Sequence, residues 1–228
     1  RARSPAPPAF HASSPNATDP NLQRESPPKA AQSAAVSATA VGSSYRDPSP
    51  QPPFAHLSNV ITVHDRFLGG CATLTSVDLS EMKTLREIGP DFMVDCQALV
   101  SVTLPASLET LGRDALRWCA ALPALDLSVC VALRTVGDNF ATGCRALAAV
   151  TLPPNTESIG DGAFTGCEAL VAIDMATMKA LRAIGSDFMA ECTALTSVAL
   201  PPALERLGKS PFKKCTNLDP KPVFENTA

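Results

Sequence analysis

Cysteine is the residue type in this chain best suited to chemistry, because a thiolate can bind a metal, attack a substrate or form a disulfide. Seven of the eight cysteines recur at alternating steps of 25 and 23 residues. They are Cys71, Cys96, Cys119, Cys144, Cys167, Cys192 and Cys215. Two unequal coils therefore alternate, and the full repeat is 48 residues long. A fixed period of this kind predicts a solenoid of stacked coils.

The repeat also bears on the role of the thiols. Equivalent positions of stacked coils lie about 5 Å apart, which would permit a bridge between neighbours. Stacked side chains point in parallel, however, and that is poor disulfide geometry. Buried thiols acting as small apolar groups fit the repeat better. Cys130, the eighth, aligns with Met82 and Met178 and so also replaces an apolar residue. We predict that the cysteines are structural.

The residue types needed for catalysis are scarce. The three histidines are His11, His56 and His64, all in or beside the first quarter of the chain. The sequence lacks HExxH, GxSxG, phosphate-loop and dinucleotide-binding motifs. A cysteine nucleophile needs a base and partial exposure, and a buried repeat position offers neither. We therefore expect no enzyme, no cofactor and no metal site.

Charge and hydropathy exclude further classes. The net charge of −3 does not indicate the basic surface that nucleic-acid binding requires. No run of 18 apolar residues predicts a membrane span in this segment. The chain starts at Arg1 without a charged-then-apolar leader, which indicates a fragment or a processed product.

Each coil begins with an apolar segment of the form LxxVxL, such as Leu99, Val102 and Leu104. Its last part alternates apolar and polar residues, which predicts a short strand with one buried face. A proline follows this strand in every short coil, for example Pro105. The long coils are 72–96, 120–144 and 168–192, and the short coils are 97–119, 145–167 and 193–215.

The second half of each coil predicts a corner and a turn. An apolar residue and a glycine, such as Ile88 and Gly89, stand seven residues before each cysteine, and a repeated glycine suits a corner. Apolar residues follow at four and three before the cysteine, where a short helical or 3-10 turn would aim them inward. Phenylalanine alternates between these two positions, as in Phe140 and Phe164, which predicts interdigitated packing.

Composition divides the chain into three parts. Residues 1–56 hold 11 of the 21 prolines with much Ser and Ala and no apolar period, which predicts a disordered tail or stalk. Residues 57–219 form the solenoid, with a partial first coil before Cys71. Residues 220–228 are a C-terminal remnant.

The outward strand positions are the natural binding surface of a solenoid. One such column reads Asp78, Thr103, Asp126, Thr151 and Asp174, and a second column of small residues includes Ser76, Ser101 and Ser197. The threonines hold successive carboxylates about 10 Å apart, too far for shared calcium coordination. This mildly acidic stripe predicts a face for a basic peptide or a polar glycan. The alternative is an ordinary solvated strand face produced by repeat duplication.

A second candidate contact is Trp118, the single tryptophan, one residue before Cys119. This position should face outward on the convex side, with Arg117 as its partner. An exposed tryptophan can anchor an interface. The alternative is a ring that leans over the neighbouring coil.

One short coil, CRALAAVTLPPNTESIGDGAFTGC at 144–167, resembles the BspA-like (Treponema-type) leucine-rich repeat family. The long coils, with DLSxMxxLxxIGxxFMxxC, resemble a variant from protist surface-protein families. The resemblance implies an α/β leucine-rich repeat solenoid with parallel strands on its concave side and helical or 3-10 turns on its convex side. It also implies a non-catalytic recognition or adhesion module, extracellular or at the cell surface, that binds a protein or glycan. The alternative is a cytoplasmic scaffold that binds a protein partner.

Overall fold

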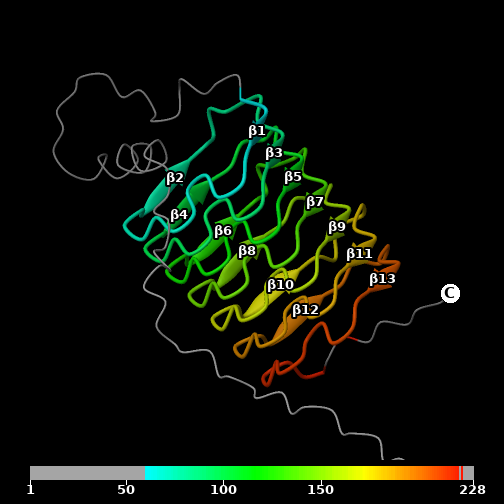
Figure 1. Ribbon diagram of the computed structural model, residues 1–228. Coiled ribbons are helices and arrows are strands. Elements are labelled where there is room, and N and C mark those ends of the chain that lie inside the picture. Colours follow the sequence, from blue (N-terminus) through cyan, green and yellow to red (C-terminus); the bar gives the residue numbers. More distant parts are fainter. Residues whose placement is uncertain (1–59, 221, 223–228) are drawn as a thin grey trace, which may run out of the picture.

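The computed structural model describes residues 60–220 and residue 222. In this part of the chain, the coils stack on one another and carry thirteen short strands and no helix. The strands lie along two opposite sides of the stack, and every bonded pair is parallel (Figure 1). The predicted tail at 1–56 and most of the remnant at 220–228 lie outside the described residues.

One side of the stack carries an unbroken seven-stranded sheet, in the order β1-β3-β5-β7-β9-β11-β13. Its strands are β1 (Thr62–Val63), β3 (Glu87–Ile88), β5 (Thr110–Leu111), β7 (Thr135–Val136), β9 (Ser158–Ile159), β11 (Ala183–Ile184) and β13 (Arg206–Leu207). The apolar residue of each apolar-glycine pair ends its strand, with its side chain directed into the core or partly buried against it. The sequence predicts only a corner here, so this sheet corrects that prediction.

The other side carries the predicted strands, but they bond only in pairs. These strands are β2 (Ser76–Asp78), β4 (Ser101–Thr103), β6 (Ala124–Asp126), β8 (Ala149–Thr151), β10 (Ala172–Asp174) and β12 (Ser197–Ala199). The pairs are β2-β4, β6-β8 and β10-β12. Each pair joins a long coil to the short coil after it, so the 48-residue repeat is a structural unit on this side.

Long and short coils end these strands by different means. In short coils a proline stands two residues after the strand, such as Pro105 after Thr103, and it has no N–H for a further ladder bond. In long coils the strand aspartate turns the chain: the Asp78 Oδ1 accepts the backbone N–H of Ser80 at 2.9 Å. This is the local turn that a short carboxylate side chain favours.

The expected helical or 3-10 turns do not form in the described residues, and the solenoid there is all-β. Isolated turns occupy these segments, because alternate N–H groups bond to the next coil. The N–H groups of Asp91, Met93 and Asp95 donate to carbonyls of residues 113, 115 and 117 at 2.8–2.9 Å. Asp91 and Asp95 also have positive φ, at 55° and 60°. Left-handed residues at this spacing stop a right-handed helix.

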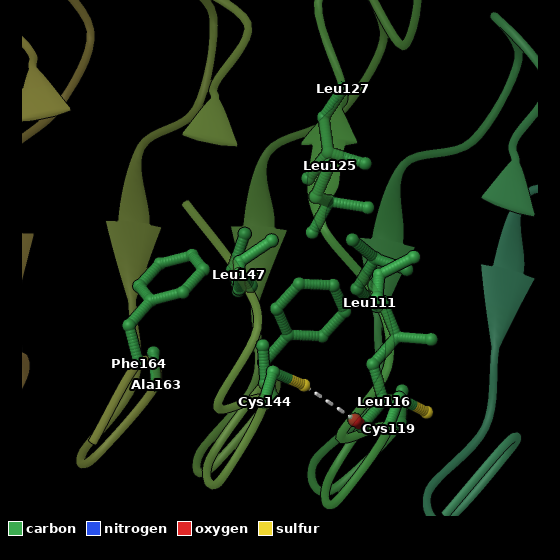
Figure 2. Packing of buried hydrophobic residues seen from close by; sticks show 14 of the residues in the cluster. Leu111, Leu116, Cys119, Leu125, Leu127, Cys144, Leu147, Ala163 and Phe164 are labelled. Atoms are coloured by element: carbon green, nitrogen blue, oxygen red, sulfur yellow. Dashed lines mark hydrogen bonds between the residues drawn. The ribbon is translucent and has the colours of Figure 1, made fainter. Parts of the chain in front are cut away.

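The core contains the repeated apolar side chains, and the predicted alternation of large residues is present. Phe140, Phe164 and Phe188 are fully buried and contact one another edge to face, with ring centroids 6.1 and 5.7 Å apart. Such T-shaped pairs suit the charge distribution of aromatic rings. The side chains from successive coils interdigitate behind the strands (Figure 2).

All eight cysteines are free and buried, as predicted. Six thiols also hydrogen-bond to the preceding coil: Cys144 Sγ donates to the Leu116 carbonyl at 3.1 Å (Figure 2). The same contact recurs at Cys96, Cys119, Cys167, Cys192 and Cys215, at 3.0–3.4 Å. Burial raises the pKa of Cys96 and of Cys144 to about 12. The thiols of Cys96 and Cys144 are therefore protonated donors and poor nucleophiles near neutral pH.

The glycine of each coil lies where two backbones meet. The Gly185 N–H donates to the Ile159 carbonyl at 2.9 Å. A β-carbon at Gly185 would overlap the backbone nitrogen and the carboxylate of Asp161 in the preceding coil. This position requires glycine for close approach, because its φ is not positive.

Candidate functional site

The predicted acidic stripe lies on strands β2 to β12. The side chains of Asp78, Thr103, Asp126, Thr151 and Asp174 are exposed, and so are those of Ser76, Ser101 and Ser197. The strand registers place Asp78 beside Thr103 and Asp126 beside Thr151. The stripe is therefore continuous along this side of the stack, while its backbone ladder is interrupted between units.

The three carboxylates of this stripe also have a structural task. Asp126 Oδ1 accepts the Ser128 N–H, and Asp174 Oδ1 accepts the Ala176 N–H, each at 2.9 Å. Hydrogen bonds from the Ser128 side chain and backbone lower the pKa of Asp126. One oxygen of each carboxylate is thus committed to a turn.

Trp118 is half-exposed, with 46% of its surface accessible. Its φ of 62° is left-handed, at a position where Gly70, Gly143 and Gly166 stand in other coils. The indole leans over the next coil: a β-carbon on Gly143 would overlap Trp118 Cδ1. The contact with Gly143 matches the second of the two alternatives for Trp118, and the exposed part of the ring still reaches solvent.

Arg117 stacks on this tryptophan, with its guanidinium carbon 3.9 Å from the ring centroid. The same guanidinium lies 3.3 Å from the carboxylate of Asp114, whose side chain is almost fully buried. Arg113 adds a second contact to Asp114 at 3.4 Å. The buried carboxylate of Asp114 therefore holds the Arg117–Trp118 pair in place.

An open groove of about 450 Å³ crosses the outer face of the seven-stranded sheet. Its floor is made of small side chains on successive strands: Thr135 on β7, Ser158 on β9 and Ala183 on β11. Gly137, Gly160 and Gly185 extend this floor without side chains. Small residues on a bonded sheet thus leave a shallow, rigid hollow.

The charges along the groove differ in how they are engaged. On one rim, Asp138 Oδ1 accepts the Asp161 N–H at 2.8 Å, and Asp161 Oδ1 accepts the Ser186 N–H at 2.6 Å. Arg113 lies at one end and pairs with Asp114. Arg206 lies at the other end, is exposed, and forms no ion pair with a described residue. The groove therefore has one uncommitted cation.

A row of ion pairs runs beside the groove, one residue before each strand of the sheet from β3 to β13. Long-coil arginines pair with short-coil glutamates: Arg86–Glu109 at 2.8 Å, Arg134–Glu157 at 3.8 Å and Arg182–Glu205 at 3.4 Å. Every pair joins the two coils of one 48-residue unit. These side chains are about half-exposed, so each pair contributes little to stability.

Sequence reasoning missed this groove because it read the apolar-glycine segment as a corner. The missed signal is a period of two. In each of these strands, an outward-facing polar or small residue precedes the inward-facing apolar residue, as Thr135 precedes Val136 and Ser158 precedes Ile159. A two-residue strand is too short for an alternating pattern to stand out in one coil.

The described part of the chain offers no metal centre, since it contains no group of three or more His, Cys, Asp or Glu side chains arranged to hold an ion. Residues 60–220 and 222 also include no helix that could cross a lipid bilayer.

A family model described as the BspA type leucine rich repeat region, in six copies, matches residues 54–140 and 134–226. The matched region begins after the first 53 residues and covers almost all of the chain that follows them. Leucine-rich repeats of this type are binding scaffolds, and nothing in the matches indicates catalysis. None of the curated proteins matches the sequence.

A solved leucine-rich repeat structure shares the fold, and other solved structures show weaker similarity. The leucine rich repeat protein of T. pallidum is 25% identical with a TM-score of 0.64, and the match covers 71% of this chain and 72% of that one. A leucine-rich repeat protein from Bacteroides ovatus is 24% identical with a TM-score of 0.41, covering 71% and 52%. A leucine rich cell surface protein from Faecalibacterium prausnitzii is 18% identical with a TM-score of 0.31, covering 70% and 69%.

Proposed function

We propose that this chain, which belongs to the BspA-type leucine-rich repeat family, is a non-catalytic module that recognises a protein ligand. The observation that carries the proposal is the pair of exposed β faces on one rigid stack. Backbone bonds fix both faces, and their outward residues are small or polar over successive coils. Such a surface can bind a partner without first paying the entropy of ordering itself.

The proposed contact residues are those of the acidic stripe, together with Arg117 and Trp118. In the stripe, the carboxylates of Asp78, Asp126 and Asp174 would meet basic groups of the ligand, and the small neighbours leave room for approach. Arg117 and Trp118 would supply a separate anchor, since Trp and Arg are enriched at binding hot spots. A glycan is the second candidate ligand, favoured only by the exposed indole and the polar stripe.

We place the module outside the cell, on the Pro-rich segment that precedes it in the sequence. The runner-up is a cytoplasmic scaffold of the same fold. The free, buried thiols suit either compartment, because they need neither oxidation nor a metal. A signal sequence or anchor in the complete gene supports the first location, and a gene without either supports the second.

The test uses the full chain as bait against an array of purified extracellular proteins and glycans. A second bait carries Asp78→Asn, Asp126→Asn and Asp174→Asn. Asparagine keeps the side-chain oxygen that accepts the turn N–H, so the fold should persist while three charges are lost. We expect a protein to bind the native bait with at least tenfold weaker binding to the variant.

A matched control carries Glu87→Gln, Glu168→Gln and Glu191→Gln, which remove the same charge outside the strands of the stripe. Equal loss in both variants would indicate a net-charge effect and remove the stripe from the proposal. Native bait that captures only glycans would replace the protein ligand with the second candidate. Native bait that captures nothing would contradict the recognition function.

A further inference from the structure

We infer that the groove over β7, β9 and β11 takes an extended segment of the protein ligand that is acidic at one end, with a ligand carboxylate on Arg206. The inference rests on the proposed recognition function and names the part of the ligand that this sheet reads. The site lies on the seven-stranded sheet, away from the Asp and Thr stripe.

Arg206 is unlike the residues that precede it in its column. It is in register with Ala183, which is in register with Ser158, and both have short side chains. No long side chain from these neighbouring strands therefore covers the groove floor beside the Arg206 guanidinium. Arg86, Arg134 and Arg182 each pair with a glutamate of the following coil, whereas Arg206 forms no ion pair with a described residue. An exposed, unpaired guanidinium can bind a carboxylate through two parallel N–H donors.

The coil that holds Arg206 is also the basic end of the stack. Residues 193–215 contain four basic side chains and one acidic side chain, Glu205, which pairs with Arg182. Lys209 follows Ser186 in the rim column of the groove, and its N–H donates to the Ser186 hydroxyl at 3.2 Å. Lys209 is exposed, so Arg206 and Lys209 place two cations at the same end of the groove. This end complements an acidic group.

The remainder of the groove tells where acidic groups will not bind. The carboxylates of Asp138 and Asp161 line the rim between the two ends, and one oxygen of each bonds to a neighbouring N–H. A ligand carboxylate beside them would be repelled. The ligand must therefore be acidic where it meets Arg206 and Lys209, and neutral or basic along the middle.

The floor favours a peptide over a sugar. None of the residues that line the groove is aromatic, so no ring is present on which a sugar could stack. Thr135 and Ser158 offer hydroxyl groups, which can bond to peptide N–H and C=O groups. From the coil of Arg113 to that of Arg206 the groove crosses four coil steps, or about 19 Å, the length of roughly six extended residues.

The experiment measures binding of labelled decapeptides to the full chain by fluorescence polarisation at physiological salt. Three probes are used, each with seven Ser residues followed by three Glu residues (the Glu probe), three Gln residues (the Gln probe) or three Lys residues. We expect the Glu probe to bind more tightly than the other two. Arg206→Glu with Lys209→Glu should weaken its binding about tenfold, because charge-assisted contacts are lost.

The control variant carries Lys83→Glu with Arg145→Glu, the same change of charge at cations that already have partners elsewhere on the stack. Its binding of the Glu probe should stay within about twofold of the native chain. Equal loss in the two variants, or equal binding of the Glu and Gln probes, overturns the inference. Polygalacturonate that binds through Arg206 more tightly than the Glu probe also overturns it, in favour of a carboxylated sugar.

The array experiment separates this inference from the proposed function. A captured protein whose binding is unchanged by Arg206→Glu and Lys209→Glu leaves the recognition function standing and contradicts the groove. A captured protein that loses binding to this variant and to no control supports both.

Discussion

The two β faces of this solenoid are built from the same coils, yet they are bonded differently. The seven-stranded sheet runs without a break from β1 to β13, although each strand has two residues. The opposite face has longer strands of three residues, but it is divided into three pairs. Strand length therefore does not decide continuity. The glycine face is continuous because a glycine in each of the six complete coils lets its backbone meet the preceding coil, whereas the strands on the other face are ended by Pro or Asp.

The comparison also separates two kinds of contact between coils. Backbone bonds at the glycines and the thiol contacts recur at every coil junction from Cys96 onward. The two-stranded sheets β2-β4, β6-β8 and β10-β12 and the Arg–Glu ion pairs join only the two coils of one unit. We expect the first kind to set the stability of the stack and the second kind to have smaller effects.

The largest effect is expected on the continuous face. Gly185→Ala places a methyl group against the backbone of Asp161, and the coils must move apart. We expect a loss of about 3 kcal/mol or more in the free energy of unfolding, measured by urea denaturation. Gly70→Ala is the control: φ there is 75° and nothing lies within 4 Å, so only backbone strain of about 1 kcal/mol is expected. Equal losses would contradict the close-approach explanation.

The thiol contacts should come next. Cys144 and Cys130 are both fully buried, but only the Cys144 thiol donates to a carbonyl of the preceding coil in the described contacts. Alanine at either position leaves a small cavity, and we expect Cys144→Ala to cost about 0.5–1 kcal/mol more than Cys130→Ala. Equal costs in urea denaturation would mean that the thiol acts only by filling space.

Alkaline titration gives an independent reading of the same thiols. Burial raises the pKa of Cys144 to about 12 and that of Cys130 to about 11, above the ordinary value near 8.5. A group with a raised folded-state pKa stabilises fully below its unfolded pKa and loses that contribution as the pH rises toward the folded one. The urea midpoint should therefore fall between about pH 9 and 12, with a shallower fall in Cys144→Ala.

The smallest effect is expected for the ion pairs within a unit. Arg86 and Glu109 are each about half-exposed at 2.8 Å, so solvent screens them. A double-mutant cycle with Arg86→Ala and Glu109→Ala should give a coupling energy of about 0.5 kcal/mol or less, decreasing with added salt. A coupling energy above about 2 kcal/mol would mean that contacts within the 48-residue unit, rather than those along the continuous sheet, set the stability of the stack.

Sequence reasoning predicted the strands at the LxxVxL segments because a buried face imposes a period of two over enough residues to be visible. It predicted helical turns before each cysteine, and these are wrong. The apolar spacing there suits a helix, but Asp91 and Met93 give their N–H groups to the next coil instead. A bond to a neighbouring coil has no signal in the spacing of a single coil.

The candidate contact residues likewise differ in whether they can be recognised from the sequence. Asp126 and Trp118 stand out in the sequence as a repeated charge and a single large ring. The groove with Arg206 does not stand out, because it consists of small residues from several coils brought into register. Its position depends on which strands lie side by side.

The sequence by itself determined the 48-residue period, the strands at the LxxVxL segments and the buried free thiols, because each repeats at a fixed interval and depends on local polarity. Only the tertiary structure decided that the glycine positions form the continuous sheet and that six thiols donate to the coil before them. Those outcomes depend on backbone groups, which are the same in every residue and become specific only when two coils meet.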